Sequence, residues 1–475
     1  MTDSPPALPA RWHPLVRAYL DDPIALAAVL ARYGSPVHLV FPQVFADNLD
    51  ALRAVFDDHP VGYRICYAHK VNKSQAFVRT AAAAGIAVDV ASPQELASAG
   101  RAGFPPDRIE VTGPKGEAFL RQLTGSGVTV NIDNLWELQT LAELVGDVAP
   151  VPVLLRVSGF TGTQVSRFGV PLRQVGAALK ILSRYRDRLT FLGPAFHLDS
   201  GETSDRLRAV GACLTLVEQA YEHGLSPSVL DIGGGLRQVF TADADEFDRY
   251  VLALRAALTG RGEPMSWGNN TFGYQIDGAK VRGTPVFHKY ANTVAAQRML
   301  ADLLAAPLEG HGGRSVAQVA ADNLLDIWVE PGKALVDHAG ATVARVEFVK
   351  EAADGSVLVA VDLSRDSVTP ADQEVMVDPL VLPGERPPSA AGAPVGVYFA
   401  GRLCLERDLI TNHKVWLPWL PRPGDLVVFP NTAGYHMDLS AAGAAMHPLP
   451  EKVAVSTDGA AFRMCPDADY SPEAN

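Results

Sequence analysis

The sequence predicts an α/β fold in which a (β/α)8 barrel is followed by an antiparallel β domain. Short apolar strand candidates alternate with Ala- and Leu-rich helical stretches through most of the chain, which is typical of a parallel sheet. Almost every one of these strands ends in a residue whose side chain can take part in catalysis or ligand binding. Barrel enzymes place their active site at the carboxyl ends of the strands. After Gly332, short β-branched segments separated by Pro and Gly turns indicate the second domain.

The elements follow in chain order. An apolar strand is expected at residues 36–41 and a helix at about 43–57. Eight barrel strands are expected to end at Lys70, 89–92, 111–113, 132–133, 155–157, 196–197, 231–232 and 328–330, with helices such as 75–84 and 94–99 between them. Strands at 343–349, 357–361, 396–399 and 426–429 and an exposed loop at 382–394 are expected in the β domain. We therefore assign residues 43–335 to the barrel and residues 1–42 and 336–475 to a β domain that the N-terminal strand completes.

Composition excludes several classes of protein. The 475 residues carry 41 basic and 53 acidic side chains, and a net charge of −12 argues against a general nucleic-acid binder. The four cysteines lie far apart, which predicts neither a metal site nor a disulfide framework. The first residues lack a basic and apolar leader, and no uncharged apolar run is long enough to span a membrane. We expect a cytoplasmic enzyme.

Four strand-end motifs carry chemistry. Lys70 ends the first barrel strand and offers an amine, and Gly233-Gly234-Gly235 can bring backbone N–H groups onto a phosphate. Glu330 ends the last strand, and the His197–Ser200 string offers an imidazole and a hydroxyl. Each motif alone has a plainer interpretation: a solvated lysine, a tight turn, a turn glutamate, a core histidine.

Together these motifs resemble one family. The order Tyr-Ala-x-Lys, His-x-x-Ser, Gly-Gly-Gly, Glu-Pro-Gly, Cys-x3-Asp and Gly-Tyr resembles the fold-type III decarboxylases that depend on pyridoxal 5'-phosphate (PLP), such as the diaminopimelate and ornithine decarboxylases. The resemblance runs from about Pro36 to about Val453 and implies an alanine-racemase-like barrel. It implies that Lys70 holds PLP as a Schiff base, that His197 stacks on the pyridine ring and that Glu330 binds the ring nitrogen.

The resemblance also implies a larger cofactor site and a shared active site. The implied cofactor-binding residues are Lys70, Asp89, Arg156, His197, Ser200, Gly233, Gly234, Gly235, Glu330, Lys333 and Tyr435. Lys333 stands where the family usually has arginine, so the charge is kept and the bidentate fork is lost. Cys404 would act in the active site of the partner subunit of a homodimer and return a proton after carbon dioxide leaves. Arg167 and Asp408 would pair across the dimer interface.

The departures from the family concern the substrate. Leu405 stands where the family has an acid that binds the distal ammonium, with Glu406 one position later on the opposite face of an extended segment. Thr369 precedes a proline where diaminopimelate enzymes carry arginine, and Arg365 is the candidate replacement. We therefore expect a substrate other than plain diaminopimelate or ornithine.

Residues 237–326 are long for one βα connection. The part around Trp267–Tyr290, with Lys280, His288 and Lys289, is either a lid that binds substrate or a surface excursion. The predicted function is decarboxylation of an amino acid or an amino-acid derivative. A racemase or epimerase on the same fold and a non-catalytic PLP-binding protein are the alternatives.

Overall fold

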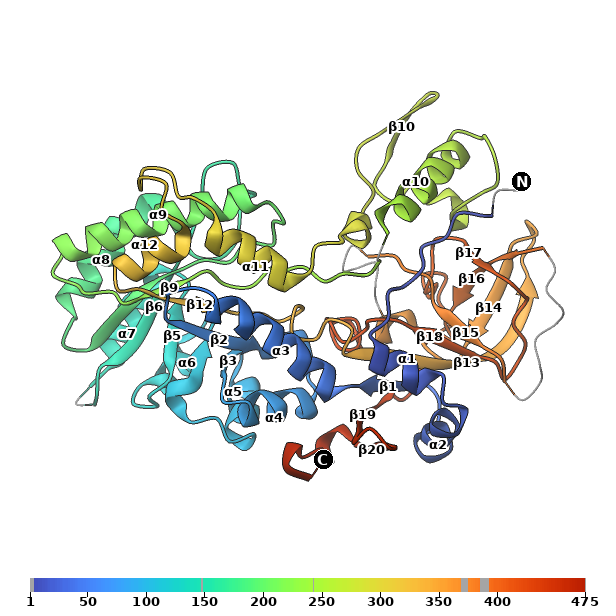
Figure 1. The fold of residues 1–475 in the computed structure, drawn as a ribbon, viewed down its shortest axis with the longest axis horizontal. Coiled ribbons are helices and arrows are strands. Elements are labelled where there is room, and N and C mark those ends of the chain that lie inside the picture. Colours follow the sequence, from blue (N-terminus) through green and yellow to red (C-terminus); the bar gives the residue numbers. More distant parts are fainter. Residues whose placement is uncertain (1–3, 147, 242, 369–374, 385–392, 475) are drawn as a thin grey trace.

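Eight parallel strands close into a barrel, as the sequence predicts (Figure 1). The computed structural model describes residues 4–146, 148–241, 243–368, 375–384 and 393–474. The barrel strands are β2 (Tyr63–Ala68), β3 (Ala87–Val90), β4 (Ile109–Val111), β5 (Thr129–Ile132), β6 (Val151–Ser158), β8 (Leu189–Ala195), β9 (Val229–Asp231) and β12 (Asp326–Val329). They run in the order β5-β4-β3-β2-β12-β9-β8-β6, and pairing of β5 with β6 closes the ring. A two-residue strand, β7 (Val170–Pro171), adds to β6.

Helices cover the outside of the barrel. They are α3 (Pro42–Asp57), α4 (Gln75–Ala83), α5 (Pro93–Arg101), α6 (Glu117–Leu123), α7 (Leu135–Leu144), α8 (Val175–Arg184), α9 (Thr203–Glu222), α11 (Ala296–Ala305) and α12 (Val316–Asp322). Side chains that follow strands cap several of them: Ser74, Ser92 and Asn134 each accept an N–H from the first turn of the next helix. Because these caps begin the helices soon after the strands end, the strand-to-helix connections are short and the strand ends lie close together at one mouth.

The second domain is a mixed sheet. Its strands are β1 (Val37–Val40), β13 (Gly340–Glu351), β14 (Val357–Val361), β15 (Leu380–Leu382), β16 (Val395–Ala400), β17 (Val415–Leu417), β18 (Leu426–Phe429), β19 (Glu451–Thr457) and β20 (Phe462–Pro466). Most neighbouring strands pair antiparallel, as the sequence predicts, but β1 is parallel to β19 and β14 is parallel to β16. Parallel pairs join segments that are distant along the chain, so a local pattern does not reveal them.

The N-terminal segment joins this sheet. Helices α1 (Pro14–Leu20) and α2 (Pro23–Tyr33) lead into β1, which lies between β13 and β19. The division of the chain at residues 42/43 and 335/336 stays a prediction. Residues 385–392 of the loop expected at 382–394 lie outside the described residues. Among the helices that the structure does describe, none has the length and apolar character needed to cross a membrane.

The long connection after β9 forms a small unit of its own. It consists of α10 (Ala244–Leu258), the 3-10 turns η4 (Trp267–Asn269) and η5 (His288–Ala291), and the hairpin β10 (Gln275–Asp277) with β11 (Lys280–Arg282). Its core contains Tyr250, Phe272 and Phe287, together with Leu8 and Met376 from distant parts of the chain. The hairpin projects from the molecule (Figure 1). The inserted span is shorter than the expected 237–326, because α11 and α12 pack as barrel helices.

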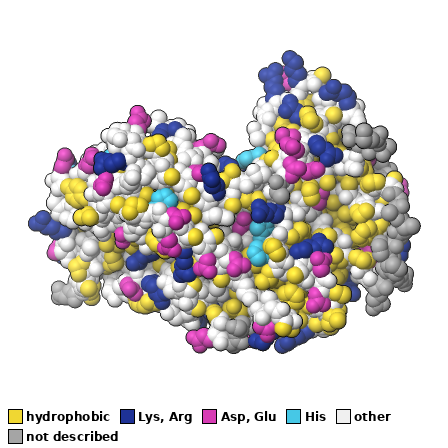
Figure 2. Space-filling model, viewed as in Figure 1, with side chains coloured by type: hydrophobic (Ala, Val, Ile, Leu, Met, Phe, Trp, Pro, Cys, Tyr) yellow, Lys and Arg dark blue, Asp and Glu magenta, His cyan; other side chains and the backbone are white. Residues whose placement is uncertain are grey.

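The insertion is attached to the β domain. The backbone N–H of Trp267 donates to the carbonyl of Asn412 over 2.8 Å, and the N–H of Lys414 donates to that of Met265 over 2.9 Å. The Lys414 ammonium also pairs with Glu263 at 2.9 Å. In Figure 2 a notch separates the insertion from the helices on the barrel, and histidine and basic side chains gather where these parts meet.

A buried ion pair ties two strand ends at the barrel mouth. The Lys115 ammonium, on the turn after β4, donates to the carbonyls of Gly113 and Asn131 and lies 3.1 Å from the Glu137 carboxylate. Glu137 also accepts the backbone N–H groups of Lys115 and Asp133. Both charged side chains are fully buried. The pair therefore joins the ends of β4 and β5 to helix α7.

We predict that Lys115→Met destabilises the protein by about 3–5 kcal/mol, because it leaves the Glu137 carboxylate buried without its partner. Urea denaturation followed by circular dichroism measures this change. Lys180→Met, at an exposed position on α8, is the matched control and should stay within about 0.5 kcal/mol of wild type. A loss below about 1 kcal/mol for Lys115→Met would show that the ion pair does not stabilise the mouth.

Candidate functional site

The mouth of the barrel holds two adjoining cavities that share Lys70, His197, Asp199 and Lys289. One cavity is also lined by Gly235, Glu330, Lys333 and Tyr435, and the other by Arg156, Arg167 and Ser200. The structure thus brings together, in one place, side chains that the sequence separates by more than 300 residues. Most of the predicted site residues lie here.

Lys70 lies in the single turn η1 (His69–Val71) that follows β2. Its ammonium lies 3.1 Å from the carboxylate of Asp89 on the neighbouring strand β3. Burial opposes the charged form, but the carboxylates of Asp89 and Glu330 raise the pKa of Lys70 above its usual value. Burial raises the pKa of Asp89 to about 6 against the opposing charge of Lys70, and the Thr112 hydroxyl donates to its other oxygen over 2.5 Å. The lysine is therefore held in place by a carboxylate that water does not reach.

His197 follows β8 and faces the residue that follows β12. Its Nδ1 accepts the backbone N–H of Gly234 over 3.2 Å and lies 3.9 Å from a carboxylate oxygen of Glu330. Burial lowers the pKa of His197, which fits a neutral ring whose Nδ1 is an acceptor. Burial also works against the charge of Glu330, yet the adjoining His197 and Lys70 hold its pKa below the usual value. The site thus presents an ionised carboxylate beside a neutral imidazole.

Two further acids lie beneath Glu330. Carboxylate oxygens of Glu110, Asp231 and Glu330 lie within 4.8 Å of one another, and all three residues are buried. The amide of Asn131 donates to Glu110 over 2.9 Å, and the N–H of Gly233 donates to Asp231 over 2.7 Å. Burial raises the pKa values of Glu110 and Asp231 well above their usual range, so these two are held as neutral acids. The spacing would also suit a metal ion, although the sequence predicts no metal.

The glycine loop after β9 requires its glycines. Gly233 and Gly235 have positive φ angles of 66° and 74°. A Cβ on Gly235 would overlap the carbonyl oxygen of Leu198, and one on Gly234 would lie 3.1 Å from the His197 ring. The loop therefore packs directly against the segment that carries His197 and Ser200. The N–H groups of Gly233 and Gly234 donate to Asp231 and His197, so Gly235 is the glycine of this loop whose N–H is left for an anion.

Lys289, from the insertion, reaches Asp199 in the segment that follows β8. The ammonium groups of Lys289 and Lys333 lie 2.9 and 3.2 Å from opposite oxygens of the Asp199 carboxylate. Although partial burial opposes it, these two lysines lower the pKa of Asp199 to about 2. Tyr435 lines the same cavity with a positive φ of 73°, and its backbone N–H donates to the carbonyl of Val71. A non-glycine residue in this conformation is uncommon and concentrates at functional sites.

The predicted substrate and proton-donor residues lie elsewhere in the chain. Cys404, Leu405 and Glu406 are exposed on the loop after β16, outside the residues that line the two cavities. Arg365 lies in a short turn beside this loop, and its guanidinium donates to the carbonyl of Arg407. Thr369 lies outside the described residues.

The two residues predicted to pair across a dimer interface differ in their exposure to solvent. Arg167 is exposed at the cavity rim, with its guanidinium 4.0 Å from the ring of Phe168. Asp408 is buried, and its oxygens accept the backbone N–H groups of Arg365 and Leu403 over 2.8 and 2.7 Å. Within one chain, Asp408 therefore holds the shape of the loop that carries Cys404. Its pairing with Arg167 of the partner subunit stays a prediction.

Sequence reasoning missed two buried charged groups of this site. Glu110 lies in the middle of β4, and Arg206 lies in the first turn of α9. Glu110 is a single charged residue in a short apolar strand, and Arg206 stands among the polar residues that begin a helix, so neither position has a strong sequence signal.

Three comparisons describe what this chain is similar to. A family model for the pyridoxal-binding domain of pyridoxal-dependent decarboxylases matches residues 46–265. The uncharacterized protein y4yA of Sinorhizobium fredii is 34% identical over 432 residues, covering 90% of this chain and 89% of that protein. The diaminopimelate decarboxylase of Halalkalibacterium halodurans is 25% identical over 429 residues, covering 85% of this chain and 83% of its own. The crystal structure of diaminopimelate decarboxylase from M. jannaschii with L-lysine has a TM-score of 0.67 at 16% identity, covering 94% and 95% of the two chains.

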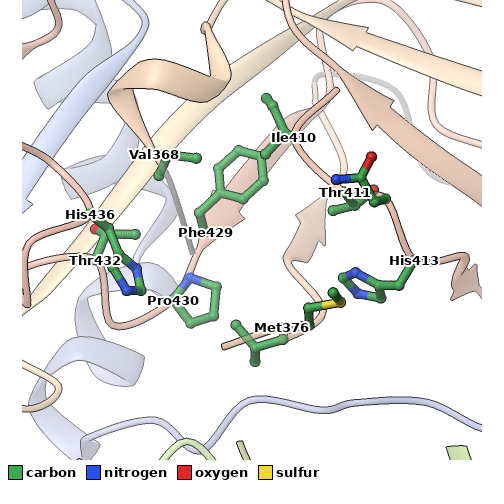
Figure 3. A pocket seen from close by; sticks show the side chains of 11 residues that line it. Val368, Met376, Ile410, Thr411, His413, Phe429, Pro430, Thr432 and His436 are labelled. Carbon is green, nitrogen blue, oxygen red and sulfur yellow. The ribbon is translucent and has the colours of Figure 1, made fainter. Parts of the chain in front are cut away.

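His436, next to Tyr435, lies in a second environment. It lines a small cavity with Met376, His413 and Phe429, and Figure 3 shows these side chains together. Neither ring nitrogen of His436 has a hydrogen-bond partner among the described residues, and the ring stacks on Phe240 with centroids 6.3 Å apart. Burial, and secondly the charge of Lys333, lowers the pKa of His436 to about 3.

We predict that this histidine makes the protein sensitive to acid. Its folded-state pKa lies below the ordinary value of 6.5, so the unfolded chain binds the proton more readily. As the pH falls from 6.5 to about 3, this histidine should lower the free energy of unfolding by about 1.4 kcal/mol per pH unit. Denaturation of His436→Asn at several pH values should show a smaller acid-side slope than wild type. His223→Asn, at the partly exposed end of α9, should keep the wild-type slope, and an unchanged slope for His436→Asn would refute the prediction.

Proposed function

This chain belongs to the pyridoxal-dependent decarboxylases of fold type III, and on that premise we propose that it is a PLP-dependent decarboxylase of an amino acid or an amino-acid derivative. We further propose that it works as a cytoplasmic homodimer. The observation that carries the proposal is the convergence of Lys70, His197, Glu330 and the glycine loop on one cavity.

The residues present fit PLP. The amine of Lys70 suits the cofactor aldehyde, and Asp89 at 3.1 Å keeps it at one position. The ionised carboxylate of Glu330 suits a protonated pyridine nitrogen, and the neutral ring of His197 suits stacking on a flat aromatic group. When bound, PLP supplies an electron sink for the carbon that loses its carboxylate.

The phosphate of the cofactor has a matching site. The Gly233–Gly235 loop, chiefly through the N–H of Gly235, would hold it together with the hydroxyls of Ser200 and Tyr435 and the cation of Lys333. A side chain on any of these glycines would collide with the backbone carbonyls of Phe196, Glu330 or Leu198 and would displace the loop from this position. Arg156 would bound the other side of the cavity, where its guanidinium lies 4.8 Å from the Phe168 ring.

Proton return is assigned to the partner subunit. Cys404 of the partner subunit would donate its thiol proton to the carbon that has lost its carboxylate, and Arg167 and Asp408 would join the two chains. Cys404 is exposed on a loop that Asp408 holds rigid, which suits a group that must enter a neighbouring site.

The substrate is proposed to lack a lone distal ammonium. Leu405 offers no charge for such a group, and a charge left without a partner in a closed pocket is costly. From the inserted segment, His288 and Lys289 line the cavity, whereas Tyr290 lies in the core of the insertion. The far end of the substrate is therefore proposed to be neutral, apolar or conjugated, with the insertion contributing to its recognition through His288 and Lys289.

We predict that the PLP-loaded protein releases carbon dioxide from at least one α-amino acid that has a free α-amine and a neutral, apolar or conjugated distal end. Its kcat/KM for that substrate should exceed the values for meso-diaminopimelate and ornithine by at least about tenfold, which is about 1.4 kcal/mol of transition-state binding. Labelled carbon dioxide and product mass measure the reaction. Borohydride should fix the cofactor to the peptide that carries Lys70.

Two results would contradict this proposal. Inversion of the α-carbon without release of carbon dioxide would identify a racemase or epimerase instead. Reduction that labels a lysine other than Lys70 would end the assignment of the cofactor site. Lys70→Ala is the negative control and should lose both activity and label, whereas Lys180→Met on α8 should keep both.

A separate prediction tests the shared active site. A mixture of inactive Lys70→Ala and inactive Cys404→Ala chains, re-associated at random, should regain about one quarter of wild-type activity, because half of the dimers are mixed and one of their two sites is complete. Cys465→Ala, at a partly exposed cysteine of β20, is the matched control and should stay active alone. No recovery in heterodimers verified by mass would place the whole site within one chain.

A further inference from the structure

Arg206 is the largest fully buried side chain of the described residues, with 1% of its surface exposed. It lies in the first turn of α9. Its Nη2 donates to the carbonyl of Leu198 over 2.7 Å and to that of Gly234 over 2.8 Å. Its Nε and Nη1 are buried and have no hydrogen-bond partner among the described residues. A buried guanidinium with two open donors is costly unless an anion lies nearby.

The neighbouring carboxylates are committed to other groups. Asp199 pairs with Lys289 and Lys333, and Asp205 accepts the hydroxyl of Ser200 and pairs with Arg208. The charge of Arg237 lies close enough to act against that of Arg206. The charge of Asp199 favours the Arg206 cation from nearby, but Asp199 is shared with two lysines and makes no hydrogen bond to the guanidinium among the described residues.

The position of Arg206 identifies the anion. Leu198 belongs to the segment that carries His197 and Ser200, and Gly234 belongs to the glycine loop, so one side chain bonds both segments that the proposed function assigns to the phosphate. A Cβ on Gly235 would lie only 2.8 Å from Nη2 of Arg206. Helix α9, with 20 residues, begins here with an N-cap residue that makes no side-chain hydrogen bond to its first turn. Arg206 is not among the residues that line the two cavities, so its charge would act on a phosphate across the loop that it bonds, together with the positive end of the helix.

We propose that Arg206 is the buried counter-charge of the cofactor phosphate and the positioning residue that holds the two phosphate-binding segments together. The identity of the ligand rests on the proposed function, while the anion site itself does not. Burial lowers the pKa of Arg206 to about 10, which leaves the side chain charged at neutral pH. Arg206 supplies the charge from within the protein, and Lys333 supplies it from the rim of the cavity.

The experiment compares two substitutions and two ligands. Arg206→Lys keeps the charge, and Arg206→Gln keeps a hydrogen-bond donor for the carbonyls without the charge. Absorbance titration gives the Kd of PLP and of pyridoxal, which lacks the phosphate. We expect Arg206→Gln to weaken PLP binding by at least about tenfold and pyridoxal binding by less than about twofold, with Arg206→Lys in between. Arg298→Met, at an exposed arginine of α11, is the control and should bind both ligands like wild type.

Equal losses for PLP and pyridoxal in Arg206→Gln would overturn the proposal, because they would show a purely structural role. A second measurement covers variants too unstable to titrate and is independent of PLP. Inorganic phosphate should raise the melting temperature of the wild-type apoprotein more than sodium chloride of equal ionic strength does, and this difference should disappear in Arg206→Gln. Failure of the wild type to bind PLP, with the phosphate effect intact, would refute the proposed cofactor and leave the anion site standing. A phosphate effect that survives in Arg206→Gln would refute the role of Arg206.

Discussion

The excess of buried acid over buried base at the mouth of the barrel is the constraint on which the site depends. Lys70 is the cation that pairs with Asp89, while Glu110, Asp231 and Glu330 lie together beneath it. Three carboxylates at this distance cannot all be ionised away from water. Burial raises the pKa values of Glu110 and Asp231, whereas the adjoining His197 and Lys70 lower that of Glu330. Glu330 is therefore the member of this cluster that favours the ionised form, and it lines the cavity, where it suits a ligand with a protonated ring nitrogen.

The sequence predicts the barrel and most of the site for a topological reason. The carboxyl ends of parallel strands meet at one mouth, so Lys70, His197 and Glu330 could be placed together from their positions after strands alone. The pairing of β14 with β16 could not be predicted, because the partners of a short β-branched strand are chosen by tertiary packing. Glu110 and Arg206 were missed for a related reason: their charge is meaningful only once the surrounding residues are known to be buried.

The β domain presents its candidate site residues on an exposed loop, whereas the barrel holds its own at the strand ends. The carboxylate of Asp408 accepts the backbone N–H groups of Arg365 and Leu403, which fixes the backbone around Leu403. Cys404, Leu405 and Glu406 next to it are exposed. A rigid backbone that presents exposed side chains lowers the conformational entropy lost when a neighbouring surface binds them. The motif that resembles the family at Cys404 and Asp408 therefore has a role within one chain that is compatible with a role between chains.

The insertion joins the two halves of the molecule at the point where they meet the cavity. It is anchored on the β domain through Met265 and Trp267, and its turn η5 sends Lys289 to Asp199 on the barrel. Asp199 lies two residues after His197 and also binds Lys333, so the insertion is tied to the loop that follows His197 without replacing any strand-end group. Changes in this segment can therefore alter the rim of the cavity while Lys70 and Glu330 stay fixed by the barrel. The strand ends therefore position Lys70 and Glu330, while the insertion contributes Lys289 to the same cavity.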